Sequence, residues 1–203
     1  MVFRRRHWCS RHALTCFSRS FLGAGQMLAD QMFHDMLTAL ALPRRTDLVP
    51  IVGHWLLTEW PDWYGAGGPG DLRADMAAFA ASETSLPIGF VALNDGVPMG
   101  FCALKAESIE SHKHLSPWVG AGFVLPGHRR HGIGAFLLQA ITDHARHLGH
   151  GHVYCATSTS SSLLRRVGWE LIDNIAHAGE PMAIFKGQTA SSAEIVAWES
   201  SAL

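Results

Sequence analysis

The feature that most constrains this chain is an apolar strand that runs into a loop with two glycines and then directly into a helix. The strand is expected over residues 118–124, the loop carries Gly132 and Gly134, and apolar residues on one face predict a helix over 135–148. Gly149 is suited to end that helix. This order presents several backbone N–H groups at the positive end of the helix, where proteins can hold phosphate oxygens.

The two loop glycines let the backbone approach an anion without an intervening side chain. Arg129, Arg130 and His131 add positive charge beside them. No Gly-Lys-Ser/Thr follows, as a P-loop would need, and the dinucleotide fingerprint lacks its third glycine. A pair of glycines at this spacing is by itself more often a tight turn. The surrounding residues therefore determine whether a phosphate-binding loop is indicated.

Two helices are predicted before the sheet. Asp47 is placed to cap the first, whose apolar residues between 48 and 56 share one face, and Pro61 ends it. A glycine-rich loop follows, and Asp71 is placed to cap the second helix.

The remaining segments predict a sheet around the glycine loop. Residues 88–93 and 99–104 read as antiparallel strands, because Asn94, Asp95 and Gly96 between them are strong hairpin-turn residues. Glycines within the strand 118–124 mark close approach by a ligand or another backbone. After the long helix we expect a strand, a short helix and a last strand pair, over 152–157, 161–167, 169–173 and 182–186.

Composition limits the class of protein and its partners. The 203 residues, 48% of them hydrophobic, suit one domain, and a formal net charge of −1 gives no general attraction to nucleic acid or anionic membrane. The four cysteines form no C-x-x-C pair, so neither a zinc ribbon nor a disulfide scaffold is indicated. Apolar stretches fall short of the ~18 residues of a membrane helix. We therefore expect a cytoplasmic protein with neither a membrane nor a nucleic-acid partner.

Three regions are expected along the chain. Residues 1–35 form a basic extension, either disordered or lying upstream of a true start at one of the methionines 27, 32 and 36. Residues 36–187 form the main domain. The serine- and alanine-rich residues 188–203 form a peripheral tail.

The stretch from Val124 to Gly134 resembles the acetyl-coenzyme A motif of the GNAT-type N-acetyltransferases, written V-x-P-x-x-R-x-x-G-x-G/A. Residues 115–118, 165–169 and 179–181 also resemble stretches of that family. The resemblance covers roughly residues 47–186.

What the resemblance implies is an α/β fold of the α+β type, with a mixed, mostly antiparallel sheet that splays at the glycine-bearing strand and is flanked by helices. It implies an N-acetyltransferase that passes acetyl from acetyl-CoA directly to an amine of a small molecule or peptide. We expect the protein to be a monomer or homodimer. The backbone amide of Phe123 would stabilise the oxyanion. The cofactor-binding residues would be Phe123, Val124, Leu125, Arg129, Arg130, His131, Gly132, Ile133, Gly134, Ala135 and Arg166.

The sequence offers several candidates for the groups that move protons. Leu164 occupies the position of the tyrosine that often protonates the leaving thiolate in this family. The alternatives are Ser161, Ser162, Tyr154 or water as the donor, or a thiolate that leaves unassisted. Glu59 and His114 are the candidate bases, because both regions border the acceptor side in the family. Residues 59–64 could line an acceptor pocket with aromatic and acidic groups.

Other readings of the chain stay open. One is a coenzyme A-binding module of the same fold that is weakly active or inactive, and a weaker one is nucleic-acid binding by the arginine-rich start. No metal is expected at the histidines 144, 147, 150 and 152. The first three, spaced by three residues, drift around the helix surface, and no carboxylate or Cys accompanies them beyond Asp143. Cys155 is expected to be a small core residue rather than a nucleophile.

Overall fold

The computed structural model describes residues 32, 33, 35–177 and 179–189. The chain divides into two units, Met1–Met36 and Leu37–Leu203, and the fold is that of the described part of the second unit. The basic extension expected at 1–35 and the tail expected at 188–203 lie almost wholly outside the described residues. Within the described part of the chain, no helix has the length and apolarity to cross a membrane.

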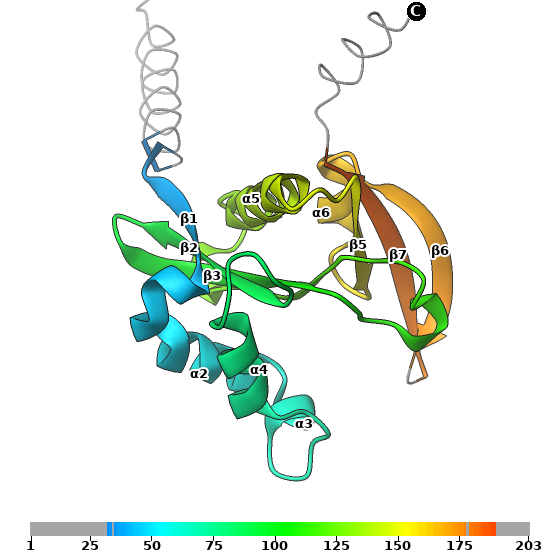
Figure 1. Ribbon diagram of the computed structural model, residues 1–203, viewed down its shortest axis with the longest axis horizontal. Helices are drawn as coiled ribbons and strands as arrows, with labels where there is room; N and C mark the ends of the chain where they lie inside the picture. Colours follow the sequence, from blue (N-terminus) through cyan, green and yellow to red (C-terminus); the bar gives the residue numbers. More distant parts are fainter. Residues whose placement is uncertain (1–31, 34, 178, 190–203) are drawn as a thin grey trace, which may run out of the picture. The chain divides into compact units, whose positions relative to one another are not determined.

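A single seven-stranded sheet forms the centre of the unit, in the order β1-β2-β3-β4-β5-β7-β6 (Figure 1). Neighbouring strands are antiparallel except β4 and β5, which are parallel. The mixed, mostly antiparallel sheet expected from the sequence is thereby confirmed. The strands are β1 (Leu37–Ala41), β2 (Ile88–Asn94), β3 (Val97–Lys105), β4 (Trp118–Val124), β5 (His152–Thr157), β6 (Glu170–His177) and β7 (Glu180–Gln188).

The hairpin between β2 and β3 forms where its turn residues predict it. Asp95 and Gly96 both have positive φ, at 49° and 77°, as a two-residue hairpin turn requires. The strand pair then continues from Asn94 opposite Val97 to Ile88 opposite Leu104.

The start of the domain differs from the sequence prediction in two ways. β1 was not expected, because its sequence Leu-Thr-Ala-Leu-Ala has no strand pattern of its own, and it is a strand because it pairs with β2. Asp47 does not cap the first helix: its carboxylate accepts two hydrogen bonds from Arg45, and the helix begins after Leu48. Asp71 does act as a cap, its Oδ1 accepting from the Ala74 N–H at 2.9 Å.

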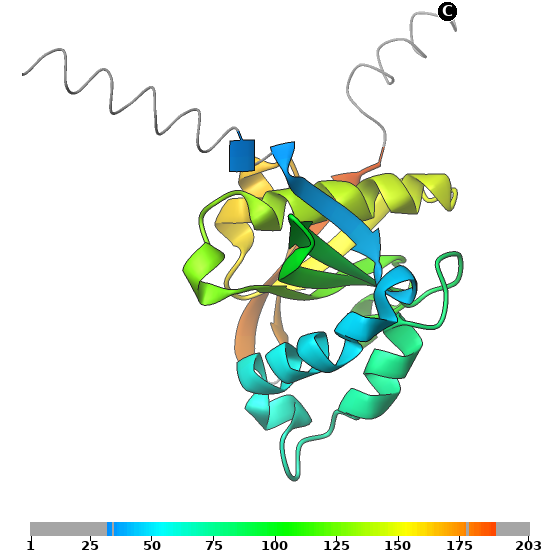
Figure 2. The ribbon, with the colours of Figure 1, turned by 90° about the vertical axis from the view of Figure 1, so that its left-hand side faces the viewer.

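Helices cover the two faces of the sheet (Figures 1 and 2). On one face lie the 3-10 helix η1 (Leu42–Leu48) and the helices α2 (Val49–Glu59), α3 (Pro61–Tyr64) and α4 (Leu72–Phe79). They bury a core that includes Val52, Leu56 and Phe79 against strand residues such as Val91 and Phe101. On the other face lie α5 (Ile133–His147) and α6 (Ser161–Arg166), with the buried side of α5 as predicted from its periodicity.

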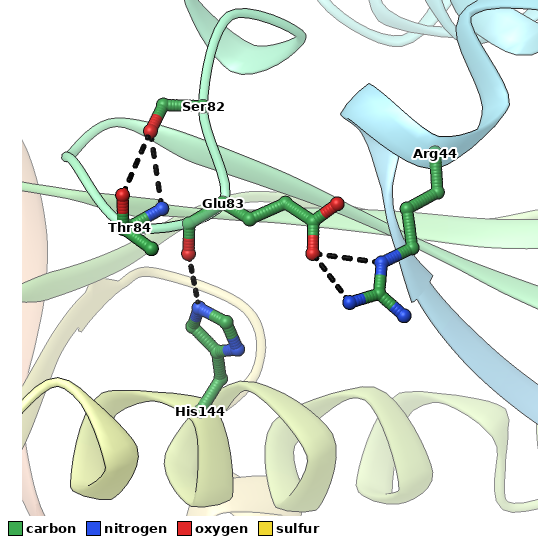
Figure 3. Close-up of polar contacts among 5 residues, drawn as sticks. All are labelled: Arg44, Ser82, Glu83, Thr84 and His144. Atoms are coloured by element: carbon green, nitrogen blue, oxygen red, sulfur yellow. Dashed lines mark hydrogen bonds and ion pairs between the residues drawn. The ribbon is translucent and has the colours of Figure 1, made fainter.

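The loop between α4 and β2 is tied to both neighbouring layers (Figure 3). The His144 Nε2–H of α5 donates to the Glu83 carbonyl at 2.7 Å, and the Arg44 Nε–H of η1 donates to the Glu83 carboxylate at 2.7 Å. The Ser82 Oγ accepts from the amides of Thr84 and Ser85. His144 is therefore used in packing the fold.

The connection from β3 to β4 covers the far end of the sheet. It includes the short 3-10 helix η2 (Glu110–His112) and buries Ile109 with Trp118 and Ile184 in a second small core. The His112 Nε2 lies 3.2 Å from the Asp173 carboxylate, which fastens this loop to the edge strand β6.

Candidate functional site

Strands β4 and β5 pair at their beginnings and then separate. Their register consists of one residue pair, Trp118 opposite Tyr154, supported by a hydrogen bond from the Tyr154 amide to the Pro117 carbonyl. β4 is otherwise paired with β3, and β5 with β7. The two facing edges beyond this pair are thus left without a strand partner, which is the splay that the sequence predicted.

A bulge in β4 lies beside the splay. Phe123 is opposite Phe101 and Gly120 is opposite Ala103, so two residues of β4 face a single residue of β3. Ala121, within the bulge, has a φ of 50°. A bulge bends its strand and redirects the backbone groups next to it, here those of residues 121–123.

The loop after β4 ends in a row of amides at the start of α5. Arg130 and Gly132 have positive φ, 70° and 81°, and Gly132 is the residue that precedes the first helical residue, Ile133. The first bond of the helix runs from the Phe136 N–H to the Gly132 carbonyl. The amides of residues 132–135 therefore have no carbonyl partner within the helix, and the helix dipole adds partial positive charge there.

A neighbouring helix approaches this first turn closely. A Cβ placed on Gly134 would lie 3.1 Å from the Leu163 Cδ2 of α6. α6 thus closes one side of the amide row, while the 3-10 helix η3 (Pro126–His128) forms the loop that leads into it.

Arg129 connects three parts of the site. Its Nε–H donates to the Val124 carbonyl at 2.9 Å, and its Nη2 donates to both carboxylate oxygens of Glu59, at 3.2 and 3.0 Å. Its guanidinium carbon lies 5.9 Å from the centre of the Phe123 ring. The structure thus brings together Glu59, Phe123 and Arg129, all of which the sequence analysis had singled out for different roles.

The side chain of Phe123 fixes the end of β4. It is buried and stacks on Trp55 of α2, with ring centres 5.3 Å apart and an angle of 28°. The ring contact therefore anchors the end of β4 against α2.

His114, the other candidate base, belongs to a different cluster. It is exposed, and its ring stacks 5.7 Å from that of His112, which contacts Asp173. Glu59 lies at the end of α2, so the two candidate bases stand on separate elements.

The predicted acceptor segment divides into structural and exposed residues. The Tyr64 hydroxyl donates to Asp75 at 2.7 Å, and burial together with this hydrogen bond raises the pKa of Tyr64, so it stays a neutral phenol. Trp60 is packed against the core. Asp62 and Trp63 are exposed, the latter at 51%.

The structure also shows where Leu164 lies and where the side chains considered in place of the missing tyrosine lie. Leu164 is almost fully buried and fills the core beneath α6. Tyr154 packs against Trp118 with ring centres 5.7 Å apart, Ser161 is half-buried and Ser162 is exposed. Arg166 is exposed at the end of α6.

One polar group near the splay was missed by the sequence analysis. The Thr157 hydroxyl, at the end of β5, accepts hydrogen bonds from the amides of Thr159 and Ser160, at 3.2 and 2.8 Å. The signal in the sequence is only a threonine at a strand end followed by small polar residues, which is common at turns.

Cysteine and metal chemistry are not supported by the described residues. Burial raises the pKa of the Cys155 thiol to about 12, although the residue keeps some exposed surface, and burial also raises the pKa of Cys102. Thiolates are therefore scarce at neutral pH. Among residues 32, 33, 35–177 and 179–189, no group of three or more His, Cys, Asp or Glu side chains could hold a metal ion.

Two hollows lie on the surface, the first of which is lined in part by Ala135 of the amide row. One, of about 530 Å³, lies between the α5 face from Ala135 to Arg146 and the β7 end near Trp169. The other, of about 610 Å³, is an apolar groove between α2 and α4. Neither contains the bulge of β4 together with the amide row, so the candidate site is assigned from the backbone geometry rather than from these hollows.

Comparison with solved structures shows the fold. An aminoglycoside 6'-N-acetyltransferase complexed with coenzyme A matches with a TM-score of 0.61 and 13% identity, covering 76% of this chain and 98% of that chain. An acetyltransferase of the GNAT family from Streptococcus pneumoniae matches with a TM-score of 0.53 and 14% identity, covering 75% and 98%. A spermidine N-acetyltransferase chimera from Vibrio cholerae and hSSAT matches with a TM-score of 0.56 and 13% identity, covering 76% and 96%.

Sequence comparison gives the family. No curated protein matches the chain significantly. The acetyltransferase (GNAT) family description matches residues 51–168, which is more than half of the chain and includes most of α2, the bulge of β4, the amide row and α6. The family's acyl donor, acetyl-CoA, is the cosubstrate that the motif at Val124 to Gly134 predicts. On this match, the chain belongs to the acetyltransferase (GNAT) family.

Proposed function

We propose that this protein is an N-acetyltransferase that transfers the acetyl group of acetyl-CoA directly to an amine of a small molecule or peptide. The observation that carries the proposal is the row of amides at residues 132–135, which opens a 15-residue helix beside the splay of β4 and β5. The bound thioester supplies an acetyl carbon that an amine can attack.

The loop and the edge of β4 supply the binding groups in this proposal. The amides of Gly132 to Ala135 would hold the diphosphate, with Arg130 and His131 beside them. Residues 123–125 would exchange backbone hydrogen bonds with the pantetheine arm on the side of β4 that faces the splay, where Arg129 donates to the Val124 carbonyl. Arg166 would lie near the nucleotide. The Phe123 amide, in the end of β4 that the Trp55 contact anchors, would stabilise charge that develops on the carbonyl oxygen.

The acceptor amine has to lose a proton before it attacks. An alkylamine with a pKa of about 10 is almost wholly protonated at neutral pH, so a base or a water relay is required. Glu59 is the leading candidate, because it lies beside the end of β4 through its contact with Arg129. His114 is the second candidate and acts from the β3–β4 connection.

A panel of amines tested with detection of released coenzyme A thiol checks the proposal. Turnover with at least one amine and a mass increase of one acetyl group on that amine are expected. Tight binding of coenzyme A by calorimetry without acetylation of any amine would count against it.

The second candidate function is a coenzyme A-binding module of low or absent activity. This alternative is suggested by Leu164, which is buried and provides no hydroxyl where the family often has a tyrosine. Leu164→Tyr tests it: if the wild type turns over and the variant is no faster, the missing hydroxyl does not limit the reaction. A cytoplasmic setting and a monomer or homodimer complete the proposal, to be checked by fractionation and by light scattering.

A further inference from the structure

Three threonines are buried in the described part of the chain, and they differ in what their hydroxyl protons do. Thr142 donates to the Leu138 carbonyl at 2.6 Å, and Thr189 donates to the His150 carbonyl at 2.7 Å. Thr157, 8% exposed, instead uses its oxygen to accept from two amides, those of Thr159 and Ser160.

The proton of the Thr157 hydroxyl is therefore available. A hydroxyl has two acceptor sites and one donor, and the two amides occupy the acceptor sites. Among the described residues, no acceptor for the proton lies within hydrogen-bond reach. Buried donors in proteins nearly always have a partner, either protein or water, so this hydroxyl can donate to an acceptor atom of a ligand that enters the splay.

The strand register places Thr157 level with the reacting end of β4. From the pair Trp118 and Tyr154, three residues along each parallel strand lead to Ala121 on β4 and Thr157 on β5. The bulge inserts one extra residue into β4, which brings Gly122 level with Thr157, one residue before Phe123. The two strands have separated by this point, so the hydroxyl and the Phe123 amide lie at the two sides of the splay.

Side-chain alternation gives the face on which Thr157 lies. Residues 153, 155 and 157 share one face of β5, and Cys155 is opposite Phe185 on β7. The Arg165 guanidinium of α6 lies 5.5 Å from the Phe185 ring centre, so this face is covered by α6. Thr157 is therefore on the helix-covered side of the splay.

We propose that the Thr157 hydroxyl donates a hydrogen bond to the sulfur of the acyl donor and stabilises the negative charge that sulfur gains in acetyl transfer. This inference rests on the proposed function. As the amine nitrogen bonds to the acetyl carbon, the carbon–sulfur bond breaks and its electron pair stays on sulfur. The extra proton of the amine passes to the base or to water, and the thiolate takes its proton from water after release.

Thr157 keeps its own proton in this step. An aliphatic alcohol is a weaker acid than a thiol, so a threonine cannot replace a tyrosine as an acid, but it can stabilise charge as a hydrogen-bond donor. The two amides that donate to its oxygen polarise the O–H bond and strengthen this donation. The role explains how the chain can release a thiolate with Leu164 in place of tyrosine.

The test compares coenzyme A with desulfo-coenzyme A, which lacks only the sulfur, as ligands of the full chain. Binding is measured by calorimetry at a pH above the pKa of the free coenzyme A thiol, determined beforehand from its ultraviolet absorbance, so that the ligand is a thiolate. We expect Thr157→Val to bind coenzyme A about tenfold more weakly than wild type, as for loss of one hydrogen bond to a charged group. Desulfo-coenzyme A should bind both proteins equally, and Thr157→Ser, which keeps the hydroxyl, should behave as wild type.

A second readout is the pKa of the bound coenzyme A thiol, followed by the ultraviolet absorbance of the thiolate. It should be higher in Thr157→Val than in wild type. Equal weakening of both ligands would show that Thr157 only orders the turn at 159–160 and would overturn the inference, as would unchanged coenzyme A binding. The proposed function fails separately, if wild type shows the sulfur-dependent binding but acetylates no amine, or fails together with the inference if wild type binds no coenzyme A.

Discussion

Glu59 and Arg129, 70 residues apart in the chain, form an ion pair in which the Arg129 Nη2 donates to both carboxylate oxygens at 3.0 and 3.2 Å. The pair joins the end of α2 to the end of β4. It also sets the candidate base beside the residue that leads into the amide row. Because both side chains are partly exposed, at 38% and 47%, the pair can exchange partners when ligands arrive.

Glu59→Gln tests whether this carboxylate acts on the amine. The amide keeps the size of the side chain and removes the base, so we expect kcat to fall about 100-fold while the affinity for coenzyme A changes little. Steady-state kinetics and calorimetry measure the two quantities. Glu110→Gln, on an exposed carboxylate paired with Lys113, is the matched control and should be unaffected. A loss of coenzyme A binding with kcat preserved would instead assign Glu59 to holding Arg129.

Gly132→Ala tests the geometry of the amide row. Gly132 has a φ of 81°, which costs an L-residue about 1–2 kcal/mol, and relaxing that strain would turn the following amides away from the ligand. We expect coenzyme A to bind at least about tenfold more weakly, as measured by calorimetry. Gly134→Ala, whose Cβ meets only the Leu163 methyl group, should bind within about threefold of wild type. Equal effects of the two changes would argue against a role for the left-handed turn.

Local chemistry made much of the fold predictable. The turn residues Asp95 and Gly96 predicted the hairpin, Asp71 predicted a helix start, and the apolar face of 135–148 predicted α5. In each case the deciding interaction lies within a few residues of the signal.

The parts that could not be predicted depend on distant partners. β1 is a strand through pairing with β2, more than 40 residues later. Asp47 is a local exception: it lies within η1, its carboxylate accepts from Arg45 two residues away, and α2 begins only after Leu48. The Glu59–Arg129 pair arises from a tertiary contact. The alignment of Thr157 on β5 with Gly122 on β4 arises from the strand register. The loop residues of the site were predicted from the motif, whereas these contacts required the structure.

Gly187→Ala tests the packing of the last strand. A Cβ at this position would overlap the indole ring of Trp169, which is itself buried. Overpacking of this kind costs typically 1–3 kcal/mol, so we expect the free energy of unfolding to fall by about 2 kcal/mol in urea titrations. Gly151→Ala, where a Cβ would meet nothing within 4 Å, should leave stability nearly unchanged.

His152 predicts a pH dependence of stability. Burial, with a smaller contribution from Lys186, holds the pKa of His152 below its ordinary value of 6.5, so the unfolded chain binds the proton more readily than the folded one. Its contribution to stability is present above pH 6.5 and is lost as the pH falls through the lower folded pKa. Urea titrations from pH 7.5 to about 5 should show a smaller loss of stability for His152→Gln than for wild type. Identical slopes for the two proteins would contradict this.

The most direct measurement is a crystal structure of the protein with acetyl-CoA. The account predicts diphosphate oxygens within hydrogen-bond distance of the amides of residues 132–135, and the thioester in the splay beside the Phe123 amide. A diphosphate bound elsewhere, or an amide row turned away from it, would contradict the account.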